Sequence, residues 1–256
     1  MYYYVFEQSH SNQDKKVHDK VKFHLEEFNI AGEVNHATPA RSAEELTDMG
    51  LRKGVSTIIA VGSDAHINRV VDTIKTVERS GMWRDIVFGV IPTDPNSSVL
   101  ERLRLSGIEE ACEALKYRRF TTIDLCYIEG VRYVFSTAEM HFSTPTQVKI
   151  RADRWEAEQS ITDLIIFSDL TLSFYSMNRD EGKISKYLKW VFGSKDNDKD
   201  YSIFRAKTMQ INSDQVLPLF IENEAVTKTP FVAYKLPRAL KLIVKRDRFI
   251  SDKEKE

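Results

Sequence analysis

The sequence has little of what marks secreted, membrane-spanning or nucleic-acid-binding proteins. Only two of its 256 residues are cysteines, Cys112 and Cys126, and both lie in apolar patterns typical of reduced packing residues in a cytosolic protein. No apolar run approaches ~18 residues, and the amino terminus has no basic leader or cleavage site, so we expect a soluble, cytoplasmic chain. A formal net charge of -1 gives no overall field that would attract nucleic acid or anionic membranes.

Several familiar catalytic and metal-binding patterns are also missing. The six histidines show no HExxH pattern and no paired spacing for metal ligands, and Ser136 and Ser143 lie in no nucleophile elbow. The chain has no internal repeat. Its length is sufficient for one large or two ordinary domains, and a change of pattern near residue 118 favours two.

Residues 1–118 alternate short apolar strands with amphipathic helical patterns. Strands are expected at 2–6, 32–37, 58–61 and 86–91. Helical spacing recurs at 17–28, 67–77, 96–105 and 108–115, and Ser42 with Glu45 forms a capping box that opens a further helix. This alternation predicts a three-layer α/β domain with a mostly parallel sheet.

Residues 119–245 show the two-residue period of half-buried strands. A hairpin is expected around Glu129 and Gly130, and this region is predicted to be a mainly antiparallel β domain, a sandwich or an open barrel. Further strands are expected at 147–152, 164–167, 170–175, 204–211, 217–222, 231–236 and 239–244. The polar loop 194–200 and the charged tail 246–256 are predicted to be mobile or disordered.

The segment 58–71 contains the most informative local pattern. A buried strand ends at Gly62, an acid follows at Asp64, and an amphipathic helix begins there. Backbone N–H groups at a helix amino terminus attract anions, and a glycine lets a phosphate approach the backbone closely. The pattern therefore predicts a phosphate site with Asp64 placed to hold a metal ion or a hydroxyl proton. The alternative is an ordinary strand-to-helix turn with a solvated aspartate.

Residues 60–71, Ala-Val-Gly-Ser-Asp-Ala-His-Ile-Asn-Arg-Val-Val, resemble a known loop. The loop that they resemble is the Gly-Gly-Asp-Gly-Thr loop of the diacylglycerol kinase catalytic-domain family, together with the Leu-Asn-Glu-Val-Val that follows it. That family includes bacterial lipid kinases and sphingosine kinases and is related to NAD kinases. Other segments are similar to family motifs in the same order: 38–46, 88–97, 220–226, 229–230 and 236–244.

The resemblance implies a two-domain kinase that binds ATP in the cleft between its domains. With magnesium, it would transfer the γ-phosphoryl group to a lipid hydroxyl. The positions that would line the nucleotide are Thr38, Gly62, Ser63, Asp64, Ala65, His66, Asn68 and Thr93. Asp64 would also bind magnesium or orient the acceptor, and Asn68 would support the loop. Glu224 matches the family's proposed proton acceptor, and Glu222 takes the place of the family's aspartate in that motif.

The loop departs from the family at Ser63, Ala65 and His66, which replace two glycines and a threonine. If the third glycine position requires a positive φ, an alanine there costs on the order of 1 kcal/mol. His66 would either donate a proton to a phosphate oxygen or only fill space. The family's early Asn-Pro-x-Ser-Gly loop is replaced by residues 7–13. These departures leave two alternatives open: a non-catalytic binding module of the same fold, and a kinase for a soluble hydroxyl, as in NAD kinases.

The expected partners are a nucleotide and a lipid or other small alcohol, without nucleic acid. A helical pattern at 182–192 has an apolar face beside lysines. It is expected either to dip into a membrane interface, which would give transient peripheral contact, or to pack on the β domain.

Overall fold

The computed structural model describes residues 2–81, 85–176 and 201–245. The chain divides into two compact units, residues 1–125 with 237–256, and residues 126–236. The last strand therefore contributes to both units, whereas the sequence pattern places 237–245 with the β domain. The predicted loop at 194–200, the helix at 182–192 and the tail at 246–256 lie outside the described residues.

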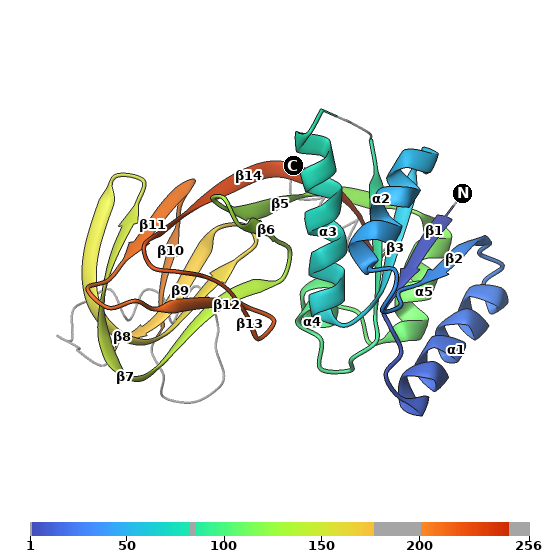
Figure 1. The fold of residues 1–256 in the computed structure, drawn as a ribbon, viewed down its shortest axis with the longest axis horizontal. Coiled ribbons are helices and arrows are strands. Elements are labelled where there is room, and N and C mark those ends of the chain that lie inside the picture. The colour runs from blue at the N-terminus through green and yellow to red at the C-terminus, as the bar shows by residue number, and fades with distance from the viewer. Residues whose placement is uncertain (1, 82–84, 177–200, 246–256) are drawn as a thin grey trace. The chain divides into compact units, whose positions relative to one another are not determined.

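The first unit is built on a parallel sheet with the strand order β14-β4-β3-β1-β2 (Figure 1). Its strands are β1 (Tyr2–Phe6), β2 (Gly32–His36), β3 (Thr57–Gly62), β4 (Val87–Pro92) and the carboxyl-terminal part of β14 (Phe231–Ile243). Both β3 and β4 are buried at every position. Continuous burial is expected for central parallel strands that are covered on both faces.

The helices cover both faces of this sheet. They are α1 (Asn12–Glu27), α2 (Ala43–Lys53), α3 (Asp64–Arg79), the short α4 (Ser98–Leu103) and α5 (Ile108–Tyr117). The hydroxyl of Tyr3 donates to the Leu46 carbonyl in α2, and that of Tyr2 donates to the Leu115 carbonyl in α5. Because neighbouring residues of a strand point to opposite faces, α2 and α5 lie on opposite sides of β1. The predicted three-layer α/β fold and the capping box of α2 are confirmed.

The second unit is antiparallel, as predicted. Its strands are β5 (Phe120–Ile128), which begins in the first unit, β6 (Arg132–Val134), β7 (Thr137–Ala152), β8 (Trp155–Phe167), β9 (Thr171–Ser176), β10 (Tyr201–Arg205), β11 (Thr208–Asn212), β12 (Pro218–Ile221) and β13 (Glu224–Lys228). The order along the sheet is β10-β9-β8-β7-β11-β14, and the β12–β13 hairpin pairs with β7. The hairpin expected at Glu129 and Gly130 joins β5 to β6.

Several strands differ from the sequence prediction in length. The strands expected at 147–152 and 164–167 are the ends of β7 and β8, whose pairing passes an irregularity between His141 and Thr146. The strand expected at 204–211 is divided into β10 and β11, because the Asp153 carboxylate accepts hydrogen bonds from Lys207 N and Thr208 N at the break. Residues 231–236 and 239–244 form one strand rather than two. Long-range pairing, which no local pattern reveals, sets these lengths.

Candidate functional site

The predicted nucleotide residues of the first unit gather at one edge of its sheet. In the register of the parallel strands, Phe6 lies beside Val61 and Gly62 lies beside Pro92. The chain therefore leaves three neighbouring strands at the same edge, where ligands of open parallel sheets bind. Thr93 N donates to the Gly62 carbonyl at 3.0 Å, which extends the β3–β4 pairing into this edge.

Glu7, the first residue after β1, occupies the space above the turn between β3 and α3. Its Oε2 accepts a hydrogen bond from Ser63 N and its Oε1 accepts one from Ser63 Oγ, both at 2.7 Å. A Cβ atom on Gly62 would lie 2.7 Å from Glu7 Cβ and 2.9 Å from His66 Cδ2, so only glycine fits there. The sequence predicts that a phosphate approaches the Gly62 backbone; in the structure, the Glu7 carboxylate of the chain itself lies there.

Asp64 is buried and fully engaged by the start of α4. Its Oδ2 accepts hydrogen bonds from Ser98 N at 2.8 Å, Ser98 Oγ at 2.7 Å and Val99 N at 3.4 Å. Its Oδ1 accepts a short hydrogen bond from Ser97 Oγ. Only 8% of the residue is exposed. A carboxylate at the amino terminus of a helix satisfies N–H groups that the helix leaves unpaired, so Asp64 holds the 93–98 loop against α3.

Magnesium does not fit this arrangement of Asp64. Mg²⁺ requires near-octahedral oxygen ligands and commonly takes one or two carboxylates. Both oxygens of Asp64 already accept hydrogen bonds. Within residues 2–81, 85–176 and 201–245, no three His, Cys, Asp or Glu side chains are grouped to hold a metal ion.

The other departures in the loop have structural roles. Ser63 is the N-cap of α3, and its Oγ accepts a hydrogen bond from His66 N at 3.3 Å. Ala65 lies in the first helical turn, so no positive φ is required there and the expected cost of replacing glycine does not arise. Asn68 is buried in the same helix, and Thr38 lies in an exposed turn where it pairs with Arg41.

His66 is a buried, neutral histidine. Its Nε2 lies 2.9 Å from the Val5 carbonyl oxygen. Because that oxygen only accepts, Nε2 must carry the proton. Burial lowers the pKa of His66, although the hydrogen bond to Val5 acts in the opposite direction. This environment favours the space-filling role of His66 over donation to a phosphate.

We expect His66 to make the protein less stable in acid. The lowered pKa means that, below ~6.5, the unfolded chain binds a proton at this side chain while the folded chain does not. The free energy of unfolding should therefore fall by up to ~1.4 kcal/mol per pH unit from this residue until the folded pKa is reached. Denaturant unfolding between pH 7.5 and 5 should show a shallower fall for His66→Gln than for wild type. The exposed His10→Gln is the control; equal slopes in all three proteins would contradict the assignment.

In the second unit, Glu224 opens β13 and lies on the surface. Its Oε2 forms an ion pair with Arg132 Nη1 at 3.2 Å, and 48% of its side chain is exposed. The turn before it contains Glu222 and Asn223, which both have a positive φ (49° and 66°). Two such residues are typical of the tight turn of a β-hairpin. The Glu-Asn-Glu motif therefore forms the end of the β12–β13 hairpin.

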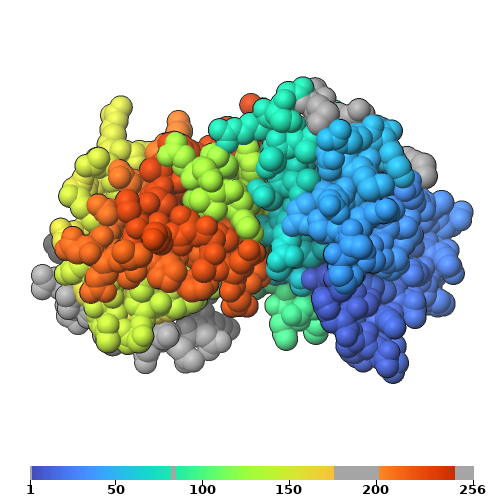
Figure 2. All heavy atoms as spheres, in the orientation of Figure 1, coloured from blue at the N-terminus to red at the C-terminus, as the bar shows by residue number. Residues whose placement is uncertain are grey.

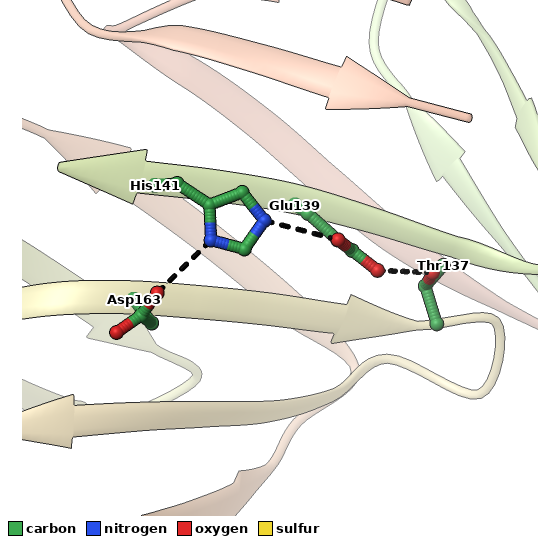
Figure 3. A network of polar contacts seen from close by, with 4 residues as sticks. All are labelled: Thr137, Glu139, His141 and Asp163. Atoms are coloured by element: carbon green, nitrogen blue, oxygen red, sulfur yellow. Dashed lines mark hydrogen bonds and ion pairs between the residues drawn. The ribbon is translucent and has the colours of Figure 1, made fainter. Parts of the chain in front are cut away.

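A pocket of about 300 Å³ lies beside this hairpin within the second unit, lined by Thr137, Glu139, His141, Phe220, Glu222 and Asn223. Figure 3 shows the polar network along it: His141 lies between the carboxylates of Asp163, at 3.0 Å, and Glu139, at 3.1 Å. The Glu139 carboxylate also accepts a hydrogen bond from the Thr137 hydroxyl at 2.8 Å. The hydrogen bond to Asp163, aided by that to Glu139, raises the pKa of His141 because both stabilise the imidazolium.

Comparisons with known proteins identify the fold and the family. Residues 4–128 match the sequence model of the diacylglycerol kinase catalytic domain. A solved structure of a diacylglycerol kinase from Bacillus anthracis str. Sterne is similar, with 14% identity, a TM-score of 0.70 and coverage of 96% of this chain and 97% of that one. A second structure from that organism, named only provisionally as a diacylglycerol kinase, has 12% identity, a TM-score of 0.73 and the same coverage.

At these identities the structural likeness establishes the fold alone. Curated proteins give no match to this sequence. The family match includes the strand, glycine turn and helix that carry the Gly62 to Asn68 motif. Residues 4–128 are therefore identified as a divergent diacylglycerol kinase catalytic domain.

Proposed function

We propose that this protein transfers a phosphoryl group from ATP to the hydroxyl of a lipid of the diacylglycerol type. The observation that carries the proposal is that the turn after β3 already binds an oxyanion. Ser63 N and Ser63 Oγ each donate to the Glu7 carboxylate at 2.7 Å, and the same N–H and O–H groups can donate to the oxygens of a phosphate. The family match includes this turn.

Phosphoryl transfer depends mainly on positioning and on stabilising negative charge, so few groups are needed. In the proposed reaction, the Ser63 N–H and hydroxyl bind a phosphate of ATP in place of Glu7, at the amino terminus of the 16-residue α3. Asp64 keeps the neighbouring loop in place through Ser97 and Ser98. No step is assigned to magnesium, since Asp64 is buried and both of its carboxylate oxygens already accept hydrogen bonds.

Glu224 is proposed to accept the proton of the acceptor hydroxyl. Its carboxylate pairs with Arg132 at the end of the β12–β13 hairpin. The pocket beside Glu222 and Asn223 has carboxylate, amide and hydroxyl groups that can hydrogen-bond an alcohol. None of the helices in the described residues is long and apolar enough to cross a membrane.

A non-catalytic binding module of the same fold is the second candidate. The observation that favours it is the burial of Asp64 and the four hydrogen bonds that it accepts from Ser97, Ser98 and Val99. A catalytic carboxylate needs at least one oxygen free for metal or substrate. In a non-catalytic binding module, Asp64 would keep only its structural contact with the start of α4.

An assay with γ-labelled ATP separates the candidates. Purified protein would be incubated with lipid alcohols in mixed micelles, beginning with diacylglycerol, and with soluble alcohols, including NAD. We expect label to be transferred to a lipid alcohol and not to the soluble ones. Transfer only to NAD or another soluble alcohol would favour the NAD kinase-like alternative. Binding of ATP without transfer to any alcohol would favour the binding module.

A further inference from the structure

The carboxylate of Glu7 is held by donors that a bound phosphate would also need. Glu7 follows Phe6, which lies beside Val61 in the β1–β3 register, and the Glu7 N–H donates to the Val61 carbonyl at 2.8 Å. This pairing fixes the Glu7 backbone, and its side chain turns onto Ser63 with one oxygen on the N–H and the other on the hydroxyl. Both oxygens are used, so the contact is bidentate and charged.

A carboxylate and a phosphate cannot share this turn. Ser63 N is a backbone donor at the start of α3, where the helix dipole favours one negative group. The space directly above Gly62 is filled by Glu7 Cβ and Oε2, which lie within 3 Å of where a Cβ on Gly62 would be. A phosphate placed there would contact the Glu7 carboxylate, and like charges at such a distance repel strongly.

We propose that Glu7 is an internal anion that closes the phosphate site of this protein, and that a phosphate-bearing ligand binds only by displacing it. The inference rests on the proposed function, because it concerns the same site. Glu7 is only partly buried, and the segment that follows it reaches the surface, where the start of α1 is visible as dark-blue spheres in Figure 2. The side chain can therefore leave the turn without disturbing the buried strands.

The consequence is a lowered apparent affinity for phosphate ligands. When only a fraction of the molecules has an open site, the apparent Kd is the intrinsic Kd divided by that fraction. A Glu7 carboxylate that leaves the turn in roughly one molecule in ten or fewer would weaken phosphate binding by about tenfold or more. Ligands without phosphate groups would be unaffected.

The test is calorimetric titration of wild type, Glu7→Ala and Glu7→Gln with ATP, inorganic triphosphate and adenosine. Glu7→Ala should bind ATP and triphosphate at least about tenfold more tightly than wild type, and Glu7→Gln should lie between them, because its neutral amide holds Ser63 more weakly. Affinity for adenosine should stay within twofold. Glu26→Gln, which removes one negative charge at an exposed position of α1, is the matched control and should bind as wild type does.

Binding and turnover are measured separately, so the outcomes are distinct. Tighter phosphate binding by the Glu7 variants without transfer to any alcohol would support the closed site and contradict the kinase proposal. Unchanged affinities in both variants would overturn the closed site, whether or not the labelled-ATP assay detects transfer. Thermal denaturation monitors folding, and if Glu7→Ala does not fold, the near-isosteric Glu7→Gln alone decides the result.

Discussion

Glu224→Gln should lower the turnover of phosphoryl transfer by roughly 100-fold while leaving thermal stability nearly unchanged. A general base contributes about 10²- to 10⁴-fold to a rate, and glutamine keeps the size of the side chain without its ability to accept a proton. The ion pair with Arg132 is half-exposed, and such pairs stabilise proteins by less than about 1 kcal/mol. The measurement is kcat in the labelled-ATP assay, with a thermal melt of each protein.

Glu156→Gln provides a matched control for this experiment. Glu156 lies on β8 of the same unit and is paired with Arg151 at 2.8 Å and Lys149 at 2.6 Å, with 42% of its side chain exposed. Its replacement removes surface ion pairs of the same kind, two rather than one, at a position without a proposed role, so kcat should not change. If wild type and Glu224→Gln have equal kcat, Glu224 is not the proton acceptor. If Glu224→Gln and Glu156→Gln lose kcat equally, the loss is a general effect of charge.

Asp64→Asn should lower the free energy of unfolding by roughly 2 kcal/mol, although the substitution opens no cavity. Hydrogen bonds to a charged group contribute about 1.5–3 kcal/mol, and the new amide NH₂ would face hydroxyl and N–H donors at Ser98 or Ser97. For a chain of this length, that loss corresponds to a fall in Tm of about 4–8 °C. Denaturant and thermal unfolding measure both quantities.

Asp94→Asn, in the 93–98 loop that Asp64 contacts, is the control for the loss of a negative charge. Asp94 is exposed, and its Oδ1 accepts one hydrogen bond, from Asn96 N at 2.8 Å, which an asparagine oxygen can also accept. Its stability should therefore stay within about 0.5 kcal/mol of wild type. If Asp64→Asn were as stable as wild type but lost a magnesium dependence of ATP binding, Asp64 would be a metal ligand and the structural assignment would be wrong.

The fold of the first unit could be predicted because its information is local. Apolar runs at β1, β3 and β4, the Ser42 capping box and the glycine after Val61 each depend on residues close in sequence. The position of the anion site follows from the same pattern, since a strand that ends at a glycine before a helix leaves N–H groups exposed.

The occupant of that site could not be predicted from local patterns. Glu7 and Ser63 are 56 residues apart, and Asp64 is 33 and 34 residues from Ser97 and Ser98. These contacts depend on the register of β1 against β3 and on the path of the loop after β4. The sequence shows that residues 7–13 replace the family's early loop. It does not show that Glu7, the first of these residues, turns back onto the turn at Gly62 and Ser63.

The same limit applies to the second unit. Thr137, Glu139 and His141 alternate along β7, a pattern that indicates one face of a strand once the strand is known. His141 meets Asp163 only because β7 pairs with β8 in a particular register. The network in Figure 3 is therefore a product of long-range pairing, and no spacing of histidines and acids in the sequence predicts it.

The amide resonance of Ser63, followed by NMR while ATP is added to the wild-type protein, tests the central claim most directly. In the ligand-free wild type, the Ser63 amide proton should resonate far downfield because its N–H is hydrogen-bonded to a carboxylate. In ligand-free Glu7→Gln, the same proton should resonate less far downfield. On addition of ATP, the Ser63 resonance should shift in a saturable way, and Glu7→Ala should reach saturation at an ATP concentration about tenfold lower. If wild-type protein binds ATP while the Ser63 amide resonance does not shift, the displacement of Glu7 by a phosphate is contradicted.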